Sequence, residues 1–347
     1  MDPTLALPYA YGTPLASGSI KDAPQDFIVE EVLSFTPNGE GEHVFLRIEK
    51  SQENTAYIAR QLKKLANVGP QAVGYAGLKD RHGRTSQWFS VQIHPDREPD
   101  WSTIESPTIR ILEKTRNLRK LRKGAIRCNR FQLTLRNVMD ETSSLERRLL
   151  KVRDNGVPNY FGPQRFGRDG QNVDQARAFF MAPDTRLDPH LRGLYLSAAR
   201  AEIFNRVLAE RVRLQSWNRA IPGDVFMFPD SMSFFKAKPE EQDLDARILQ
   251  HQIHPSGPLV GQEPSPAEDE ALRIEAEVMN TVQDLCSGLA NLRMETARRP
   301  LRLCPVDMTW HMSEPGVLKL SFELPSGTYA TTVLRELICA HSLQFEA

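Results

Sequence analysis

The densest polar cluster on otherwise apolar ground is Gly74-Tyr75-Ala76-Gly77-Leu78-Lys79-Asp80-Arg81-His82-Gly83-Arg84-Thr85. A short strand of small residues runs here into a turn that carries a single carboxylate, Asp80, among several cations. Because nearby cations favour the ionised form of a carboxyl group, Asp80 is a candidate nucleophile or base rather than a general acid. On composition alone, a salt-bridged turn between two strands accounts for the same residues.

The neighbours of Asp80 in the sequence do not supply its partner. If the segment is extended, side chains alternate between faces, so Lys79 and Arg81 point away from the face of Asp80. The cation that faces Asp80 must then come from another place, and Lys21 and Arg84 are the candidates.

Around this cluster, the first third of the chain has the alternation typical of strands. Phe27, Val29 and Glu31 share one parity, and residues 43–48 follow the turn signals Pro37-Asn38-Gly39. These features predict a β-hairpin. A helix is expected to begin at a plausible N-cap, Ser51, with Asn54 close behind, and to continue until Gly69-Pro70 ends it. Strands are expected over 73–76 and 87–93.

The rest of the chain contains a helix-rich region with strand-like segments on either side of it. A strand over 131–135 and a helix from about 142 to 153 precede a helix-rich region, which includes a helix over 195–212 and proline- and glycine-containing loops such as 254–258. A strand over 317–324 and a helix over 330–340 then close the chain. We therefore expect a β-rich domain of residues 1–154 plus 304–347, interrupted by an inserted domain of residues 155–303.

Composition indicates a globular chain of about two domains, with 347 residues, 40% hydrophobic and 25% charged. Although the net charge is +0, one segment of the chain is strongly basic and another is strongly acidic. Ten basic residues and one acid lie between Arg110 and Arg136, which suits a polyanion such as a nucleic acid, although a solvated basic face explains them equally well. Eleven acids and two basic residues lie between Pro239 and Asp284, which indicates solvated loop and helix turned away from any nucleic acid.

Several common chemistries lack their motifs. Gly83-Arg84-Thr85-Ser86 has neither the spacing nor the lysine of a phosphate-binding loop, and His251 and His254 have no carboxylate frame for zinc. The four cysteines are scattered, which fits a reduced, cytoplasmic chain without structural zinc. Prolines and glycines interrupt the uncharged segment Pro3–Ile20, so it is expected to be neither a membrane span nor a signal peptide.

Seven motifs spread along nearly the whole chain resemble, in order, the signatures of the tRNA pseudouridine synthase D (TruD) family. They are Lys21-x-x-Pro24-x-Asp26-Phe27-x-Val29-x-Glu31, Ala76-Gly77-Leu78-Lys79-Asp80-Arg81, Asn117-x-x-Lys120-Leu121-Arg122-Lys123-Gly124, Asn129-x-Phe131, Asn159-Tyr160-Phe161-Gly162-x-Gln164-Arg165-Phe166-Gly167, Ser197-Ala198-Ala199-Arg200 and Leu324-Pro325-x-Gly327-x-Tyr329-Ala330-Thr331. Seven motifs in the same order are far more specific than any one of them.

The resemblance implies an α+β fold: a pseudouridine-synthase catalytic domain, with a mixed, mainly antiparallel sheet and flanking helices, interrupted by a family-specific α/β insertion. It implies an isomerase without cofactor or metal that converts a uridine of tRNA, typically position 13 in the D arm, to pseudouridine. Asp80 matches the catalytic aspartate, and Phe27, Asn129 and Tyr329 match residues that line the uracil pocket. The family often carries Phe where Tyr329 stands.

The chemistry of the residues adds to this expectation. Phe131 and Lys21 complete the predicted substrate-binding set. The flat apolar ring of Phe131, like those of Phe27 and Tyr329, can hold a detached base while it turns. Phosphates beside a flipped-out nucleotide are expected to bind four basic residues, the predicted RNA-binding set Lys120, Arg122, Lys123 and Arg127. We expect a monomer whose partner is tRNA. The alternatives are a non-catalytic tRNA-binding or folding chaperone and a base-excising glycosylase.

Overall fold

The computed structural model describes residues 7–140, 142–229, 231–237 and 243–340. Its largest element is a ten-stranded sheet with the central order β14-β15-β7-β2-β5-β3-β6, to which β1, β16 and β4 are attached. The strands are β1 (Ser17–Ile20), β2 (Phe27–Leu33), β3 (His43–Lys50), β4 (Val73–Tyr75), β5 (Arg84–Gln92), β6 (Ile109–Asn117), β7 (Ile126–Met139), β14 (Val306–Glu314), β15 (Val317–Pro325) and β16 (Cys339–Ala340).

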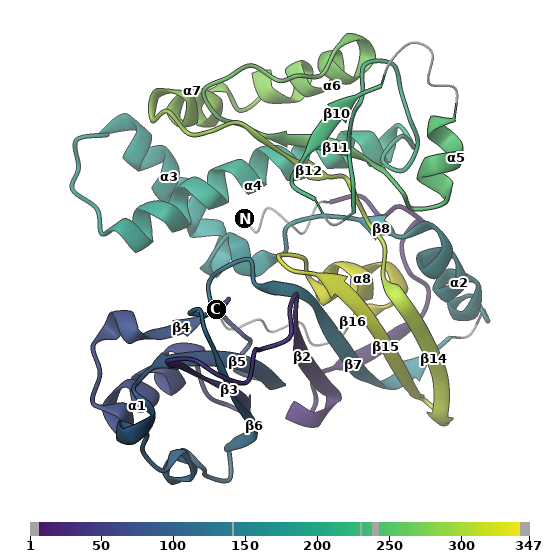
Figure 1. Cartoon of the computed structure of the whole chain (residues 1–347). Coiled ribbons are helices and arrows are strands. Elements are labelled where there is room, and N and C mark those ends of the chain that lie inside the picture. Colours follow the sequence, from purple (N-terminus) through teal and green to yellow (C-terminus); the bar gives the residue numbers. More distant parts are fainter. Residues whose placement is uncertain (1–6, 141, 230, 238–242, 341–347) are drawn as a thin grey trace.

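Both ends of the chain contribute to this sheet. The late strand β15 pairs antiparallel with the early strand β7 along its length, and β14 continues the sheet beyond it. In Figure 1 the yellow strands β14 and β15 accordingly lie beside the blue β7. The sheet is mainly antiparallel, with parallel pairing only of β2 with β5 and of β1 with β16 among the described strands.

One face of the β15–β7–β2 part is apolar because hydrophobic residues alternate along all three strands. Phe131 of β7 lies in register with Val29 of β2 and with Phe322 of β15, and all three are buried. Helices α2 (Leu145–Asn155) and α8 (Ala330–Leu337) cover this face with their own apolar stripes. Burial of these alternating side chains therefore determines the strand register.

Helix α1 (Thr55–Ala66) covers the β3–β5 part of the sheet. Ile58 and Leu62 are fully buried against Val44 and Leu46 of β3. The helix begins after Asn54 rather than at Ser51, and it ends at Asn67, whose φ of 50° lies in the left-handed region that asparagine tolerates.

The described residues between α2 and β14 form five α-helices and a small four-stranded sheet. The helices are α3 (Gln171–Met181), α4 (Pro189–Arg213), α5 (Leu244–Leu249), α6 (Asp269–Asn280) and α7 (Gln283–Asn291). The sheet has the order β10 (Phe234–Lys236), β9 (Val225–Met227), β11 (His254–Leu259) and β12 (Ala297–Pro300). These elements occupy the upper part of Figure 1. Where the chain leaves and re-enters the large sheet's region, β8 (Val157–Pro158) pairs with β13 (Arg302–Leu303).

The predicted hairpin of residues 27–31 and 43–48 is wrong. Both segments are strands, but β5 lies between them, parallel to β2 and antiparallel to β3. Local alternation identifies a strand without identifying its partner, and here a later strand occupies the position between the two.

The expected loop 254–258 is also wrong, since these residues belong to the buried strand β11. Proline has no N–H to donate, but its carbonyl still accepts, and Pro255 O receives the N–H of Leu301 at 2.8 Å. The acidic window is therefore not only solvated loop and helix: it contains α5, α6 and this buried strand, while residues 239–242 lie outside the described residues.

Other differences concern the ends of elements and two strands without an apolar signal. Helix α4 is longer than the predicted 195–212 at both ends, and the final helix stops at Leu337 instead of residue 340. Strands β6 and β14 were not expected because most of their residues are polar and exposed or half-buried, as edge strands allow.

Candidate active site

Asp80 lies in the turn between β4 and β5, with 25% of its side chain exposed. Its Oδ2 accepts a hydrogen bond from the Lys21 ammonium, and the two groups form an ion pair. Its Oδ1 accepts the backbone N–H of His82 at 2.9 Å. The carboxylate is thus held by a cation and a backbone donor, yet it remains open to solvent.

These contacts determine the ionisation of Asp80. Burial by itself raises the pKa of this carboxyl group, but the charge and hydrogen bond of Lys21, together with the His82 N–H, outweigh that effect. The net result is a pKa below the ordinary value of aspartate. Asp80 is therefore ionised at neutral pH, as a nucleophile or general base must be.

Of the two cations considered for Asp80, the structure selects Lys21. Arg84 instead pairs with Glu49 of β3 at 2.8 Å. Lys21 follows β1 with a φ of 61°, in the left-handed region, and its ammonium lies 4.2 Å from the centre of the Phe27 ring. One side chain thus joins the carboxylate to an aromatic ring that was predicted to bind substrate.

A second lysine, Lys50 at the end of β3, approaches Asp80 from the buried side. Its side chain is inaccessible to solvent, and its ammonium donates to the backbone carbonyl of Asp80 at 3.0 Å. Burial lowers the pKa of Lys50 to about 8, although the neighbouring Asp80 raises it. Nothing in the sequence indicated this contact, because a lysine that ends a strand is ordinarily solvated.

Lys79 turns away from Asp80, as the alternation predicted, and connects the turn to the middle of the sheet. Its ammonium lies 2.7 Å from Glu31 Oε1 and donates to Asn129 Oδ1 at 2.9 Å. Asn129 and Glu31 are register partners on the neighbouring strands β7 and β2. Sequence position alone did not show that the predicted substrate residue Asn129 is bonded to the residue before Asp80.

Phe27 and Phe131 lie together beneath this cluster. Their rings meet edge to face with centroids 6.2 Å apart, and Phe131 also stacks on Phe322 at 5.4 Å. Each residue is only 6% exposed and belongs to the main hydrophobic core. The two rings are therefore packed as a floor below Lys21 rather than as free-standing walls.

Tyr329 lies after the end of β15, on a half-buried loop before α8. Its hydroxyl accepts a hydrogen bond from Arg165 at 3.0 Å, and Arg165 also donates to Ser197 at 2.8 Å. Among the described residues, no hydrogen bond joins Tyr329 to Asp80 or Asn129. The structure thus brings Lys21, Phe27, Asp80, Phe131 and Asn129 into one connected cluster and places Tyr329 in a different one.

Comparison with known proteins identifies the family. The family model for tRNA pseudouridine synthase D (TruD) matches residues 6–174 and 170–337. A tRNA pseudouridine synthase D of Methylococcus capsulatus is 46% identical over 332 residues, which are 96% of this chain and 94% of the relative. A second, from Nitrosococcus oceani, is 45% identical over 335 residues, with 96% and 93% coverage. The chain belongs to the TruD family.

A solved structure supports the fold of this TruD chain. The crystal structure of a putative tRNA pseudouridine synthase D from Methanosarcina mazei matches with a TM-score of 0.70 and 21% identity, covering 95% of each chain. The predicted α+β fold, with a mixed, mainly antiparallel sheet and flanking helices, is therefore confirmed.

In the basic window of this TruD chain, residues 110–136, some cations are paired with acids and others are exposed. Half of the cations are paired with acids: Lys114 and Arg116 with Glu98, Arg127 and Arg130 with Glu323, and Arg136 with Asp26. Lys120 donates to the carbonyl of Gln71 at 2.7 Å. Arg122 and Lys123 are exposed and have no ion pair within the described residues. Of the predicted RNA-binding residues, these two are the most available to a phosphate.

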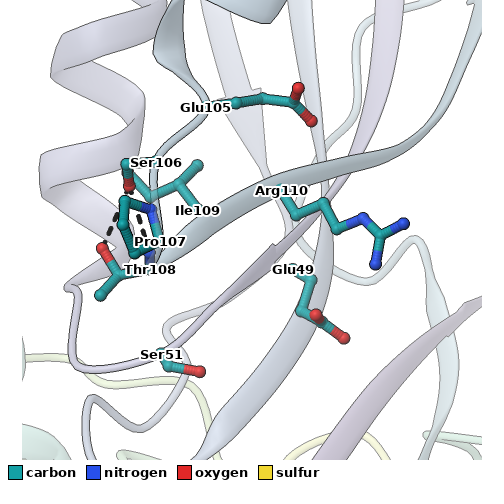
Figure 2. Close-up of a pocket in the computed structure, with 8 residues that line it drawn as sticks. All are labelled: Glu49, Ser51, Glu105, Ser106, Pro107, Thr108, Ile109 and Arg110. Atoms are coloured by element: carbon teal, nitrogen blue, oxygen red, sulfur yellow. Dashed lines mark hydrogen bonds between the residues drawn. The ribbon is translucent and has the colours of Figure 1, made fainter.

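A cavity of about 350 Å³ lies where β3 ends and β6 begins, and it is lined by Glu49, Ser51 and residues 105–110. Figure 2 shows Glu49, Glu105 and Arg110 on one side of it and Ser106, Pro107 and Thr108 on the other. Since two carboxylates line it, it suits a phosphate poorly. It does not include any residue of the Asp80 cluster.

Within the described residues, no helix is long and apolar enough to cross a membrane, and no group of three or more histidine, cysteine or acidic side chains is placed to hold a metal ion.

Proposed function

We propose that this chain isomerises a specific uridine of tRNA, position 13 in the D arm, to pseudouridine, and that Asp80 acts on a flipped-out nucleotide. Membership of a family of pseudouridine synthases supports the reaction class. One observation carries the assignment of Asp80: its carboxylate is ionised and accessible, and the Lys21 ammonium positions it.

The reaction breaks the bond between C1′ and N1, turns the base and joins C1′ to C5. Asp80 can serve it in two ways, by attacking C1′ as a nucleophile or by removing a proton from the sugar as a base. Both need the ionised carboxylate, which Lys21 stabilises. The contact between Lys50 and the Asp80 carbonyl fixes the backbone of the turn, so the carboxylate is held ready before substrate arrives.

The base is held on the Asn129 side of Asp80. Phe27 and Phe131 supply an apolar floor, and Tyr329 supplies an aromatic face from the loop after β15. Apolar surfaces allow the detached uracil to turn, whereas a complete set of hydrogen bonds would prevent it. Asn129 orients one polar edge of the base.

The RNA contacts come from the loop between β6 and β7. Arg122 and Lys123 bind phosphates next to the flipped nucleotide, together with Lys120 of the same loop and Arg127 at the start of β7. The attraction helps to offset the few kcal/mol that flipping a base costs.

Residues 1–154 and 304–347 form the catalytic domain, and residues 155–303 form an inserted domain. The paired strands β8 and β13 support this division, since both crossings of the chain lie there side by side. Residues 1–6 and 341–347 of the catalytic domain lie outside the described residues.

The first test is Asp80→Asn. We expect no pseudouridine from this variant, with tRNA affinity unchanged to within about threefold, because the amide keeps the shape of the side chain but cannot act as nucleophile or base. The measurements are pseudouridine mapping by carbodiimide adducts and a filter-binding titration.

Asp184→Asn, at an exposed aspartate between α3 and α4, is the matched control and should retain full activity. If the parent protein binds tRNA but forms no product, the chain is a tRNA-binding or folding chaperone instead. Release of free uracil would indicate a glycosylase.

A further inference from the structure

The hydrogen bond between Lys79 and Asn129 determines which way the Asn129 amide faces. An ammonium has only donors, so the atom that it meets at 2.9 Å must be the amide oxygen. The –NH₂ group therefore points away from Lys79. Within the described residues, Nδ2 makes no hydrogen bond, so its two N–H donors are what Asn129 offers to a substrate.

Lys79 is itself held in place by a buried carboxylate. Its ammonium lies 2.7 Å from Glu31 Oε1, and the Glu31 side chain has no exposed surface. Glu31 Oε2 in turn accepts the backbone N–H of Trp88, on β5, at 3.0 Å. A chain of contacts thus runs from the sheet backbone through Glu31 and Lys79 to the amide, and it opposes any flip of Asn129.

We propose that Glu31 and Lys79 are positioning residues that lock Asn129 as a hydrogen-bond donor to a uracil carbonyl. The proposal rests on the proposed function, since it concerns the base that the enzyme turns. It assigns a role in base selection to two residues that do not themselves touch the base.

Because of the symmetry of uracil, a donor in a fixed position can bind the base both before and after it turns. The base exchanges N1 for C5 when it turns by half a revolution about the axis through N3 and C6. The same rotation exchanges the carbonyl at C2 with the carbonyl at C4. A donor that meets one carbonyl before the turn therefore meets the other carbonyl after it, at the same place, without any movement of the protein.

The same geometry rejects cytosine. Cytosine has an amino group where uracil has the carbonyl at C4, so in one of the two orientations the Asn129 –NH₂ would face another donor. A buried donor without an acceptor is costly, which is how a polar site discriminates between bases. An amide free to flip could present its oxygen and would lose this discrimination.

The test uses the double variant Lys79→Met/Glu31→Gln. Lys79→Met alone would leave the Glu31 carboxylate buried without its partner, which is strongly destabilising. Replacing both groups removes the ion pair, while the amide oxygen of the introduced glutamine can still accept the Trp88 N–H. Lys236→Met is the matched control, since it removes an exposed lysine that pairs with Glu268.

The readout is the thio effect, the ratio of single-turnover rates on tRNA with uridine and with 4-thiouridine or 2-thiouridine at the target position. Sulfur accepts hydrogen bonds weakly, so we expect the parent and Lys236→Met to slow about three- to tenfold on the thio substrates. In the folded double variant the rate on uridine falls, tRNA affinity changes little, and the thio effect shrinks to within about twofold.

A thio effect of unchanged size in the double variant, or none in a parent that converts uridine, would overturn the role of Lys79 and Glu31 while leaving the proposed function standing. A parent that converts no uridine at all would overturn both. Should the double variant fail to fold, Asn129→Ala in the same assay decides, because loss of the donor must also abolish the thio effect.

Discussion

At the residue scale, the Lys21 side chain contacts both the Asp80 carboxylate and the Phe27 ring. Lys21 also adopts a left-handed backbone conformation. A non-glycine residue at positive φ costs free energy, and such strain is retained where the surrounding contacts compensate for it. Here the compensation is the ion pair with a carboxylate that burial alone would make less acidic.

We predict that Lys21→Met moves the acid limb of the pH–rate profile to higher pH. Lys21 lowers the pKa of Asp80, so its loss raises that pKa, and less carboxylate is ionised at any pH near it. Activity should therefore fall most at low pH. It should fall least at pH values well above the pKa of Asp80 in both the parent and the variant. The measurement is kcat against pH at saturating tRNA, with Lys236→Met as the control.

An acid limb that stays in place in Lys21→Met would show that another group sets the ionisation of the reacting carboxylate.

At the scale of elements, β4 connects the Asp80 turn to the basic loop between β6 and β7. Gly74 in β4 has no room for a side chain: an added Cβ would lie 2.6 Å from the Leu121 carbonyl and 2.9 Å from Lys120 Cε. Leu121 is further tied to the sheet, since its N–H donates to Ser90 Oγ of β5 at 3.0 Å. The loop that carries Arg122 and Lys123 is thus packed directly on the strand that leads to Asp80.

Gly74→Ala should consequently displace this loop. We expect a loss of about 1–3 kcal/mol in the free energy of unfolding, because backbone atoms must move to admit a methyl group, and weaker tRNA binding. Denaturant titration and filter binding measure the two effects. Gly69→Ala is the control, since nothing lies within 4 Å of a Cβ there and the backbone is extended.

A Gly74→Ala protein with normal stability and normal tRNA affinity would mean that the loop is not held by β4.

At the scale of the whole molecule, a net charge of +0 leaves local charge to decide where a polyanion binds. Acids from three distant segments neutralise half of the basic window: Asp26, Glu98 and Glu323. What remains unpaired within the described residues includes Arg122 and Lys123, on the loop that packs against β4. The positive surface that is free to attract RNA is therefore smaller than the basic window of the sequence.

We predict that Arg122→Gln/Lys123→Gln weakens tRNA binding and lowers the slope of log affinity against log salt concentration by about one to two, since each lost phosphate contact removes about one released counterion. Lys63→Gln/Lys64→Gln, at two exposed lysines of α1, is the control with the same change in charge. An unchanged slope in the first variant would show that this loop faces something other than RNA.

Sequence periodicity was sufficient for most of the elements that surround the site. The alternation of β2, β7 and β15 and the helical spacing of α1 and α4 are local properties, because each follows from which side chains one strand or helix must bury. Even the buried Glu31 left a sign: it is a charged residue on the apolar parity of Phe27 and Val29, where a carboxylate needs a partner.

Which elements and side chains meet was decided only by the tertiary structure. From the sequence alone it follows that Asp80 comes after a strand of small residues, that cations surround it in the sequence and that the chain resembles the TruD family. The sequence could not determine that β5 separates β2 from β3, that Lys21 rather than Arg84 faces Asp80, or that Lys79 fixes the Asn129 amide. The physical reason is that these contacts join residues far apart in the chain, so their geometry depends on the packing and register of the whole sheet rather than on local periodicity.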